Sequence, residues 1–424
     1  MAAPVRREAG ARYLRLVLLA ALIGVPAAFL AAVFLAAVNW LQRALWTDLP
    51  HAIGASTPPW YLVLGLPVVG AGIVVAARTL LPGDGGHPPL GGLDMTPTPV
   101  RNGPGVALAA IGALGFGAVL GPEGPLIALG SVVGMAVTPL VRGDERGKAV
   151  LATAGSFASI SALFGGPVVA GMLLVEAGVG EGAALIPALL PGLVAAALGY
   201  VIFIGFGTWG GLPAASLHVP DLPVYQGLHL TDLLVAIGVG LVAGVVIEGV
   251  RVLGKRIEGV PLGLPYLLLA GGLVVGGLAL LARALGADSQ DLLFSGQAGV
   301  PAIVSQSSLT VVLVLLIGKA LAYAVCLGCG FRGGPVFPAI FIGIGVAALA
   351  EHAFGTSPTL TVAVGAAAGM AGMTRLLFAP ILFALLLVGM DGVAAVPAAV
   401  LAGVASWLLT TALRRESTED GEKE

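Results

Sequence analysis

The string Gly121-Pro122-Glu123-Gly124-Pro125 ends one apolar segment, residues 104–120, and begins another, residues 125–141. A proline is tolerated in the first turn of a helix, so Pro125 indicates a helix that starts here. The free amides of a first turn, together with the helix dipole, favour a negative charge. Glu123 therefore places a carboxylate at the positive end of a helix between two apolar segments. Two interpretations stay open: a cap that only satisfies backbone amides, and a tethered carboxylate that competes with a free anion.

The composition around this string is that of a membrane protein. Of the 424 residues, 58% are hydrophobic and only 10% are Asp, Glu, Lys or Arg, against about 25% in soluble proteins. The 65 Gly and 29 Pro are spread through apolar runs, which excludes a disordered protein. The formal net charge of −2 gives no indication of nucleic acid binding. Cys326 and Cys329 lie in an apolar segment without further ligands, so we expect two buried thiols, no metal site and no cofactor.

The first apolar stretch is predicted to be a retained helix. It runs from Leu16 to about Trp40. This is longer than the apolar region of a signal peptide and exceeds the about 20 residues that span a bilayer. Arginines precede it, which puts the N-terminus in the cytoplasm, and two arginines at the end of the last span suggest the same side for the C-terminus. We expect a cytoplasmic tail at residues 1–12 and a short, charged cytoplasmic tail, too short to fold, at residues 414–424.

Two halves of the chain share short strings in the same order. The matched pairs are Gly124-Pro125 before Gly130 with Gly334-Pro335 before Gly343, and Phe164-Gly165-Gly166-Pro167 before Glu176 with Phe378-Ala379-Pro380 before Asp391. Several apolar segments are too short to span a bilayer or are broken by Gly or Pro. Such segments at matching places of two halves indicate a transporter-like fold with a site near the bilayer midplane. We therefore expect an all-α polytopic membrane protein with halves at residues 13–206 and 230–413, joined by a loop at 207–229.

The matching turn of the second half is Gly330-Phe331-Arg332-Gly333-Gly334-Pro335-Val336-Phe337-Pro338. Glycines before a helix leave a bare backbone that an anion can approach closely. Arg332 either adds positive potential there or is a structural residue whose charge reaches water.

Lys319 lies in an otherwise apolar span, where a lone charge costs several kcal/mol. It therefore needs a partner, and the candidates are Glu123, Glu176 and the anion itself. We favour a long-range electrostatic attraction of the anion, with a structural ion pair as the alternative.

These strings resemble the motifs of the CLC family of chloride channels and chloride/proton exchangers. Glu123 lies in a string similar to the family's G-[K/R]-E-G-P motif, with Pro122 in the place of the basic residue. Lys319 and the glycine-rich turn up to Pro338 are similar to the K…GSG…GGxFxP stretch. The segment that ends at Glu176 is similar to the one that ends in a pair of glutamates.

The resemblance implies a CLC-like inverted-repeat bundle of many tilted and broken helices. It also implies a homodimer with one anion pathway in each subunit. Glu123 takes the role of the gate, which blocks the pathway and relays protons in exchangers. The anion site implied by the resemblance consists of Gly85, Gly86, Gly124, Pro125, Gly334, Val336 and Phe337, with electrostatic support from Lys319 and Arg332.

The anion site departs from the family pattern at two places. The family's first motif is GSGxP, and its nearest match is Asp84-Gly85-Gly86-His87-Pro88. Gly85 stands in the place of the serine, so a hydroxyl is lost. Asp84 or His87 beside it would alter the local field. Pro335 falls where the family usually donates an amide, and proline has no N–H.

The inner side also departs from the pattern. Ala177 replaces the second glutamate of the pair, so the usual proton coupling is in doubt, and Glu176 becomes a proton-pathway residue or an ion-pair partner. We expect the family's last helix, with its anion-coordinating tyrosine, to be missing.

These departures favour passive, channel-like conduction of chloride or a similar small anion. The alternatives are an anion/proton antiporter, a fluoride-handling variant and a non-transporting membrane interaction protein. The sequence contains neither an HExxH pair nor a convincing nucleophile–base pairing, so we expect no catalytic residues and no enzyme. The expected setting is a bacterial inner membrane, crossed many times by each copy of a homodimer.

Overall fold

The computed structural model describes residues 3–140, 145–178, 185–205, 210–211 and 217–421, and this part of the chain is helical, without β-strands. The helices before residue 206 are α1 (Ala3–Arg43), α2 (Leu49–Ala52), α3 (Trp60–Leu80), α4 (Gly103–Leu114), α5 (Glu123–Ala136), α6 (Glu145–Leu163), α7 (Pro167–Glu176) and α8 (Leu185–Ile204). Those after residue 229 are α9 (Leu230–Glu258), α10 (Leu264–Ala284), α11 (Ser289–Leu292), α12 (Val300–Val304), α13 (Leu309–Cys329), α14 (Val336–Phe354), α15 (Pro358–Thr374), α16 (Phe378–Val388) and α17 (Val396–Gly421).

The helices confirm a polytopic membrane protein. Among the described residues, seven helical stretches are long and apolar enough to span a membrane. Others are too short: α5 has 14 residues, α7 has 10 and α16 has 11, whereas about 20 are needed. These short helices are the broken segments that the sequence predicts. The predicted connecting loop at 207–229 lies partly outside the described residues.

Both ends of the chain are more helical than the sequence indicates. Helix α1 begins at Ala3, and α17 continues to Gly421. The prediction that the charged C-terminal residues are too short to fold is therefore wrong. A helix that already exists adds residues at low cost, whereas a separate short peptide would have to nucleate a new helix.

The two halves pack their central helices in the same way. A β-carbon at Gly130 in α5 would meet the carbonyl of Gly155 in α6, and one at Gly343 in α14 would meet the carbonyl of Gly365 in α15. Small residues let membrane helices approach to backbone contact. Gly130 and Gly343, which correspond in the sequence, thus have the same packing role.

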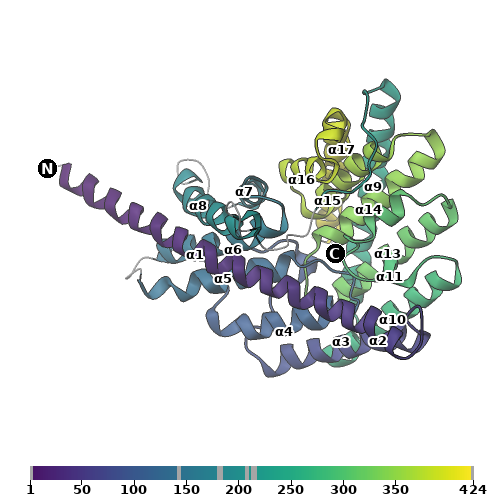
Figure 1. Ribbon diagram of the computed structural model, residues 1–424, viewed down its shortest axis with the longest axis horizontal. Helices are drawn as coiled ribbons and strands as arrows, with labels where there is room; N and C mark the ends of the chain where they lie inside the picture. The colour runs from purple at the N-terminus through teal and green to yellow at the C-terminus, as the bar shows by residue number, and fades with distance from the viewer. Residues whose placement is uncertain (1–2, 141–144, 179–184, 206–209, 212–216, 422–424) are drawn as a thin grey trace.

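Figure 1 shows how the halves lie together. The long α1 crosses in front of the other first-half helices, and its N-terminal end projects from the molecule. Helix α3 packs against α10, which joins the first half to the second. Cys326 and Cys329 are free and buried in α13, as predicted.

Candidate anion pathway

The two glycine-rich turns of the sequence meet in the interior. Gly121 and Gly334 form an antiparallel bridge, with N–O distances of 2.8 Å from Gly121 N to Gly334 O and 2.5 Å in the reverse direction. A β-carbon at either glycine would overlap the carboxylate of Glu123. The glycines therefore make room for a charged group directly between the starts of α5 and α14.

Glu123 is fully buried at this junction. Its Oε1 accepts hydrogen bonds from the amides of Val336, at 2.5 Å, and Phe337, at 3.1 Å, which are the first two residues of α14. Its Oε2 is buried and has no hydrogen-bond partner among the described residues. The carboxylate thus occupies the positive end of a helix that begins in the opposite half, as a free anion would.

Three phenylalanine rings surround the start of α14. The ring of Phe337 lies 6.1 Å from that of Phe164 and 5.7 Å from that of Phe383, between ring centroids. Phe164 and Phe383 are themselves 5.2 Å apart, in an edge-on arrangement. This cluster places an apolar surface beside the Glu123 site.

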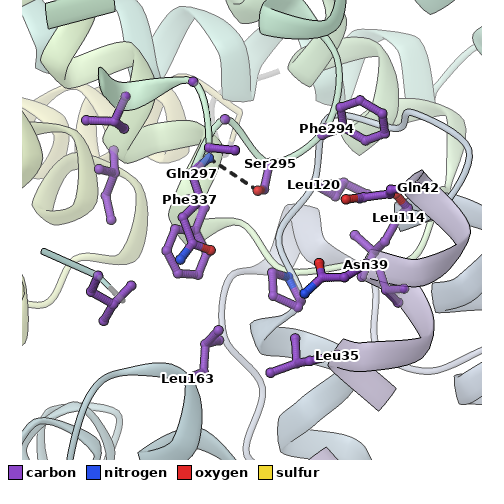
Figure 2. A pocket seen from close by; sticks show the side chains of 18 of the residues that line it. Leu35, Asn39, Gln42, Leu114, Leu120, Leu163, Phe294, Ser295, Gln297 and Phe337 are labelled. Atoms are coloured by element: carbon purple, nitrogen blue, oxygen red, sulfur yellow. Dashed lines mark hydrogen bonds between the residues drawn. The ribbon is translucent and has the colours of Figure 1, made fainter. Parts of the chain in front are cut away.

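A cavity of about 630 Å³ lies on one side of Glu123. Figure 2 shows Asn39 and Gln42 of α1 on one wall and Ser295, Gln297 and Phe337 on the other. Most of the remaining lining is apolar, and its other polar side chains are those of His218, Gln290 and Asp291. Such a lining can accommodate a partly hydrated small ion.

A second cavity, of about 20 Å³, lies on the other side. Its volume suits one water molecule or a small ion. Gly85, Gly86, Gly124 and Pro125 all line it, together with Arg332. Four of the seven residues expected at the anion site therefore lie around one small space.

The order of these cavities places Glu123 between them. Pro122 and Phe337 line the large cavity, whereas Gly124 and Pro125 line the small one. A third cavity, of about 400 Å³, shares Gly92 and Leu93 with the small cavity. Its lining includes the basic residues Arg251, Arg375 and Arg414.

Comparison with known families agrees with this geometry. The model of a family described as voltage gated chloride channel matches residues 84–410, which include both glycine-rich turns. The chain belongs to the CLC family of voltage-gated chloride channels. Anion transport across a membrane is the function of this family, and its members are transporters and channels.

Relatives and solved structures extend the match over nearly the whole chain. YfeO of Escherichia coli (strain SMS-3-5 / SECEC), an ion-transport protein by name, is 29% identical over 360 residues, which cover 80% of each chain. A slow cyanobacterial Cl⁻/H⁺ antiporter has a TM-score of 0.74 at 20% identity and covers 94% of this chain and 95% of its own. A CLC-type fluoride/proton antiporter has a TM-score of 0.72 at 22% identity, covering 93% and 95%. These structures share the CLC fold with this protein.

The other predicted site residues bind partners that the sequence does not identify. Nζ of Lys319 donates to the carbonyls of Asp291, Leu292 and Leu293, at 2.9, 3.0 and 2.9 Å. It also lies 4.4 Å from the centre of the Phe341 ring. Among the described residues Lys319 forms no ion pair, and its long-range electrostatic attraction of the anion stays a prediction. The carbonyls at the end of α11 form a negative helix terminus that binds the ammonium group instead.

Arg332 is buried and forms an ion pair with the exposed carboxylate of Asp84. Its guanidinium donates to Asp84 Oδ2, at 2.5 Å, and to the carbonyl of Asp84, at 3.0 Å. Arg78 binds the same carboxylate at 2.8 and 2.9 Å. Partial burial raises the pKa of Asp84, but the hydrogen bonds and charges of the two arginines outweigh it, and the net pKa lies below the ordinary value. Arg332 thus holds the loop before α4 against the second half, while its charge stays beside the small cavity.

Glu176 caps a helix in the second half. Its carboxylate accepts hydrogen bonds from the amides of Leu377, Phe378 and Ala379, at 2.8, 2.8 and 2.7 Å. Among the described residues it forms no ion pair, so that alternative is wrong. Its role in a proton pathway stays a prediction.

Two buried groups near Glu123, Tyr323 and Cys326, have partners that the sequence does not identify. The hydroxyl of Tyr323 donates to the carbonyl of Pro335 at 2.7 Å, and Sγ of Cys326 accepts from the amide of Val119 at 3.2 Å. Both side chains lie on α13 and fix the turn before α14 and the strand-like segment before Gly121. Their only signal in the sequence is a polar atom inside an apolar helix.

Proposed function

We propose that this protein moves chloride or a similar small anion across the membrane through a pathway within each subunit, with Glu123 as the gate. The observation that carries the proposal is the position of the Glu123 carboxylate. It binds the amides of Val336 and Phe337 between a cavity of about 630 Å³ and one of about 20 Å³. An anion that binds these amides must displace the carboxylate. Displacement of the carboxylate joins the two cavities.

Passive conduction is our first candidate for the mode of transport. Ala177 cannot carry a proton, and the neighbouring Glu176 is held by three backbone amides. A carboxylate that accepts three hydrogen bonds from one helix start is held in place there. This arrangement favours gating by the anion over obligatory proton exchange.

Proton-coupled exchange is the second candidate. Structural neighbours are named as Cl⁻/H⁺ and fluoride/proton antiporters. In addition, Oε2 of Glu123 is buried without a partner, and protonation of that oxygen would release the carboxylate from the amides.

Purified protein in chloride-loaded liposomes distinguishes the candidates. Chloride efflux without stoichiometric proton movement indicates conduction, whereas proton movement against a gradient indicates exchange. Repeating the assay with fluoride tests the fluoride-handling variant. No flux of any halide would support a non-transporting interaction protein.

The gate is tested by Glu123→Gln, which keeps the size of the side chain and removes its charge. A neutral amide competes poorly with an anion for the amides of α14, so we expect faster flux that no longer requires displacement of a carboxylate. Glu145→Gln, at the exposed start of α6, is the matched control. Flux and pH dependence equal to those of the unmodified protein would reject Glu123 as the gate.

We also propose a homodimer in a bacterial inner membrane, with both termini in the cytoplasm. The arginine-rich start of α1 and the arginines of α17 support this orientation. Reporter fusions at each end test the orientation, and the mass of the detergent-solubilised protein tests the dimer.

A further inference from the structure

The loop between α3 and α4 contains a hydrogen-bonded group of three polar side chains. Nδ1 of His87 lies 2.9 Å from Oδ2 of Asp94, and Nε2 of His87 lies 3.3 Å from Oγ1 of Thr96. The backbone amide of Thr96 donates to Oδ1 of Asp94 at 2.8 Å. Both ring nitrogens of His87 and both oxygens of Asp94 are thereby engaged.

This group borders the small cavity beside the gate. His87 and Asp94 line the cavity together with Gly124 and Pro125, the two residues that follow Glu123. The side chains are 33% and 40% exposed, so protons can reach them from water. A pair of titratable groups thus shares a space of about 20 Å³ with the expected anion site.

The geometry accommodates His87 with or without an additional proton. When the ring is neutral, Nδ1–H donates to Asp94 and Nε2 accepts from the hydroxyl of Thr96. When the ring is protonated, Nε2–H donates to the same hydroxyl oxygen, which rotates its hydrogen away. His87 therefore takes a proton from water at Nε2, and returns it, without losing a hydrogen bond.

The proton changes the charge that an anion meets in the cavity. With neutral His87, the carboxylate of Asp94 gives the pair a charge of −1 beside the cavity, and protonation cancels it. The other charges nearby form the cluster of Arg332, Asp84 and Arg78, in which both arginines bind the single carboxylate. That cluster keeps the same charge in both states of His87.

We propose that His87, Asp94 and Thr96 form a proton-binding site that raises the affinity of the small cavity for anions when it is protonated. The inference rests on the proposed function of the cavity as an anion site. It assigns the link between protons and anions to this loop, on the side of the gate where Ala177 offers no acid.

The experiment uses the full-length protein with Glu123→Gln, because this change removes the titration of the gate. Chloride flux from liposomes is measured between pH 5 and 8. We expect flux to rise toward acid pH by about fivefold or more, a typical coupling between two sites. Adding His87→Gln should make the profile flat at the low, alkaline level, whereas adding His51→Gln, at the exposed end of α2, should leave it unchanged.

In the Glu123→Gln background, Asp94→Asn should raise flux at alkaline pH, where His87→Gln leaves it low. It removes the negative charge from the cavity, so flux at pH 8 should rise above that of the parent.

The possible results separate this inference from the function on which it rests. A flat profile in Glu123→Gln, a slope that persists in His87→Gln, or unchanged flux at pH 8 in Asp94→Asn overturns the inference and leaves anion transport intact. Absence of anion flux in the unmodified protein and in every variant overturns both.

Discussion

At the scale of single residues, three ionisable side chains in apolar segments bind backbone groups rather than opposite charges. Glu123 and Glu176 each accept amides at the start of a second-half helix, and Lys319 donates to three carbonyls. The sequence identifies these residues as exceptional because ionisable groups in apolar segments are costly. It cannot identify their partners, because backbone amides and carbonyls are the same in every residue.

Lys319→Met tests this view of the lysine. It leaves the carbonyls of Asp291, Leu292 and Leu293 without their donor, and an unsatisfied buried group costs about 1–3 kcal/mol. We expect a lower melting temperature in detergent and an unchanged apparent affinity for chloride in the protein that remains folded. Lys148→Met, which removes a surface pair with Glu145, is the control. If Lys319→Met has normal stability but binds chloride more weakly, the result would support a long-range electrostatic role for Lys319.

At the scale of elements, small residues decide how closely the central helices pack. The pairs α5–α6 and α14–α15 meet at glycines whose β-carbons would reach a neighbouring backbone carbonyl. In the sequence, Gly130 and Gly343 belong to one of the two matched pairs of strings. The sequence does not show which helices they bring together, because that depends on the crossing of elements that are separated by turns.

Gly343→Ala should therefore destabilise the protein by about 1–3 kcal/mol, since the added methyl meets the backbone of α15. Gly277→Ala in α10 is the matched control, because a β-carbon there meets no atom within 4 Å. Alanine stabilises an unobstructed helical position by about 0.5–1 kcal/mol relative to glycine. Thermal unfolding in detergent measures both, and equal melting temperatures for the two variants would contradict close packing at Gly343.

At the scale of the whole molecule, the two halves are held together at the site itself. The Gly121–Gly334 bridge, the contact of Glu123 with α14 and the pair of Asp84 with Arg332 all connect residues more than 200 positions apart. The anion pathway therefore exists only when both halves are folded and joined.

The pair of Asp84 with Arg332 predicts a pH dependence of stability. The pKa of Asp84 is lowered from 3.8 in the folded protein, so its contribution is present above pH 3.8 and is lost as the pH falls through the lower, folded value. Between neutral pH and that range, the unmodified protein should be more stable than Asp84→Asn, and the difference should shrink in stronger acid. Melting curves across this range provide the measurement, and a difference that grows toward acid would reverse the sign of the argument.

The sequence by itself determined the membrane class, the repeated halves, the CLC family and the place of Glu123 at the start of a helix. Composition, broken apolar segments and glycine-rich turns express these properties locally, in residues that lie next to one another. Only the tertiary structure decided that Lys319 binds carbonyls, that Glu176 caps α16 and that His87 and Asp94 face the cavity beside the gate. Those facts depend on which distant backbone groups meet, and the meeting is fixed by the packing of the two halves.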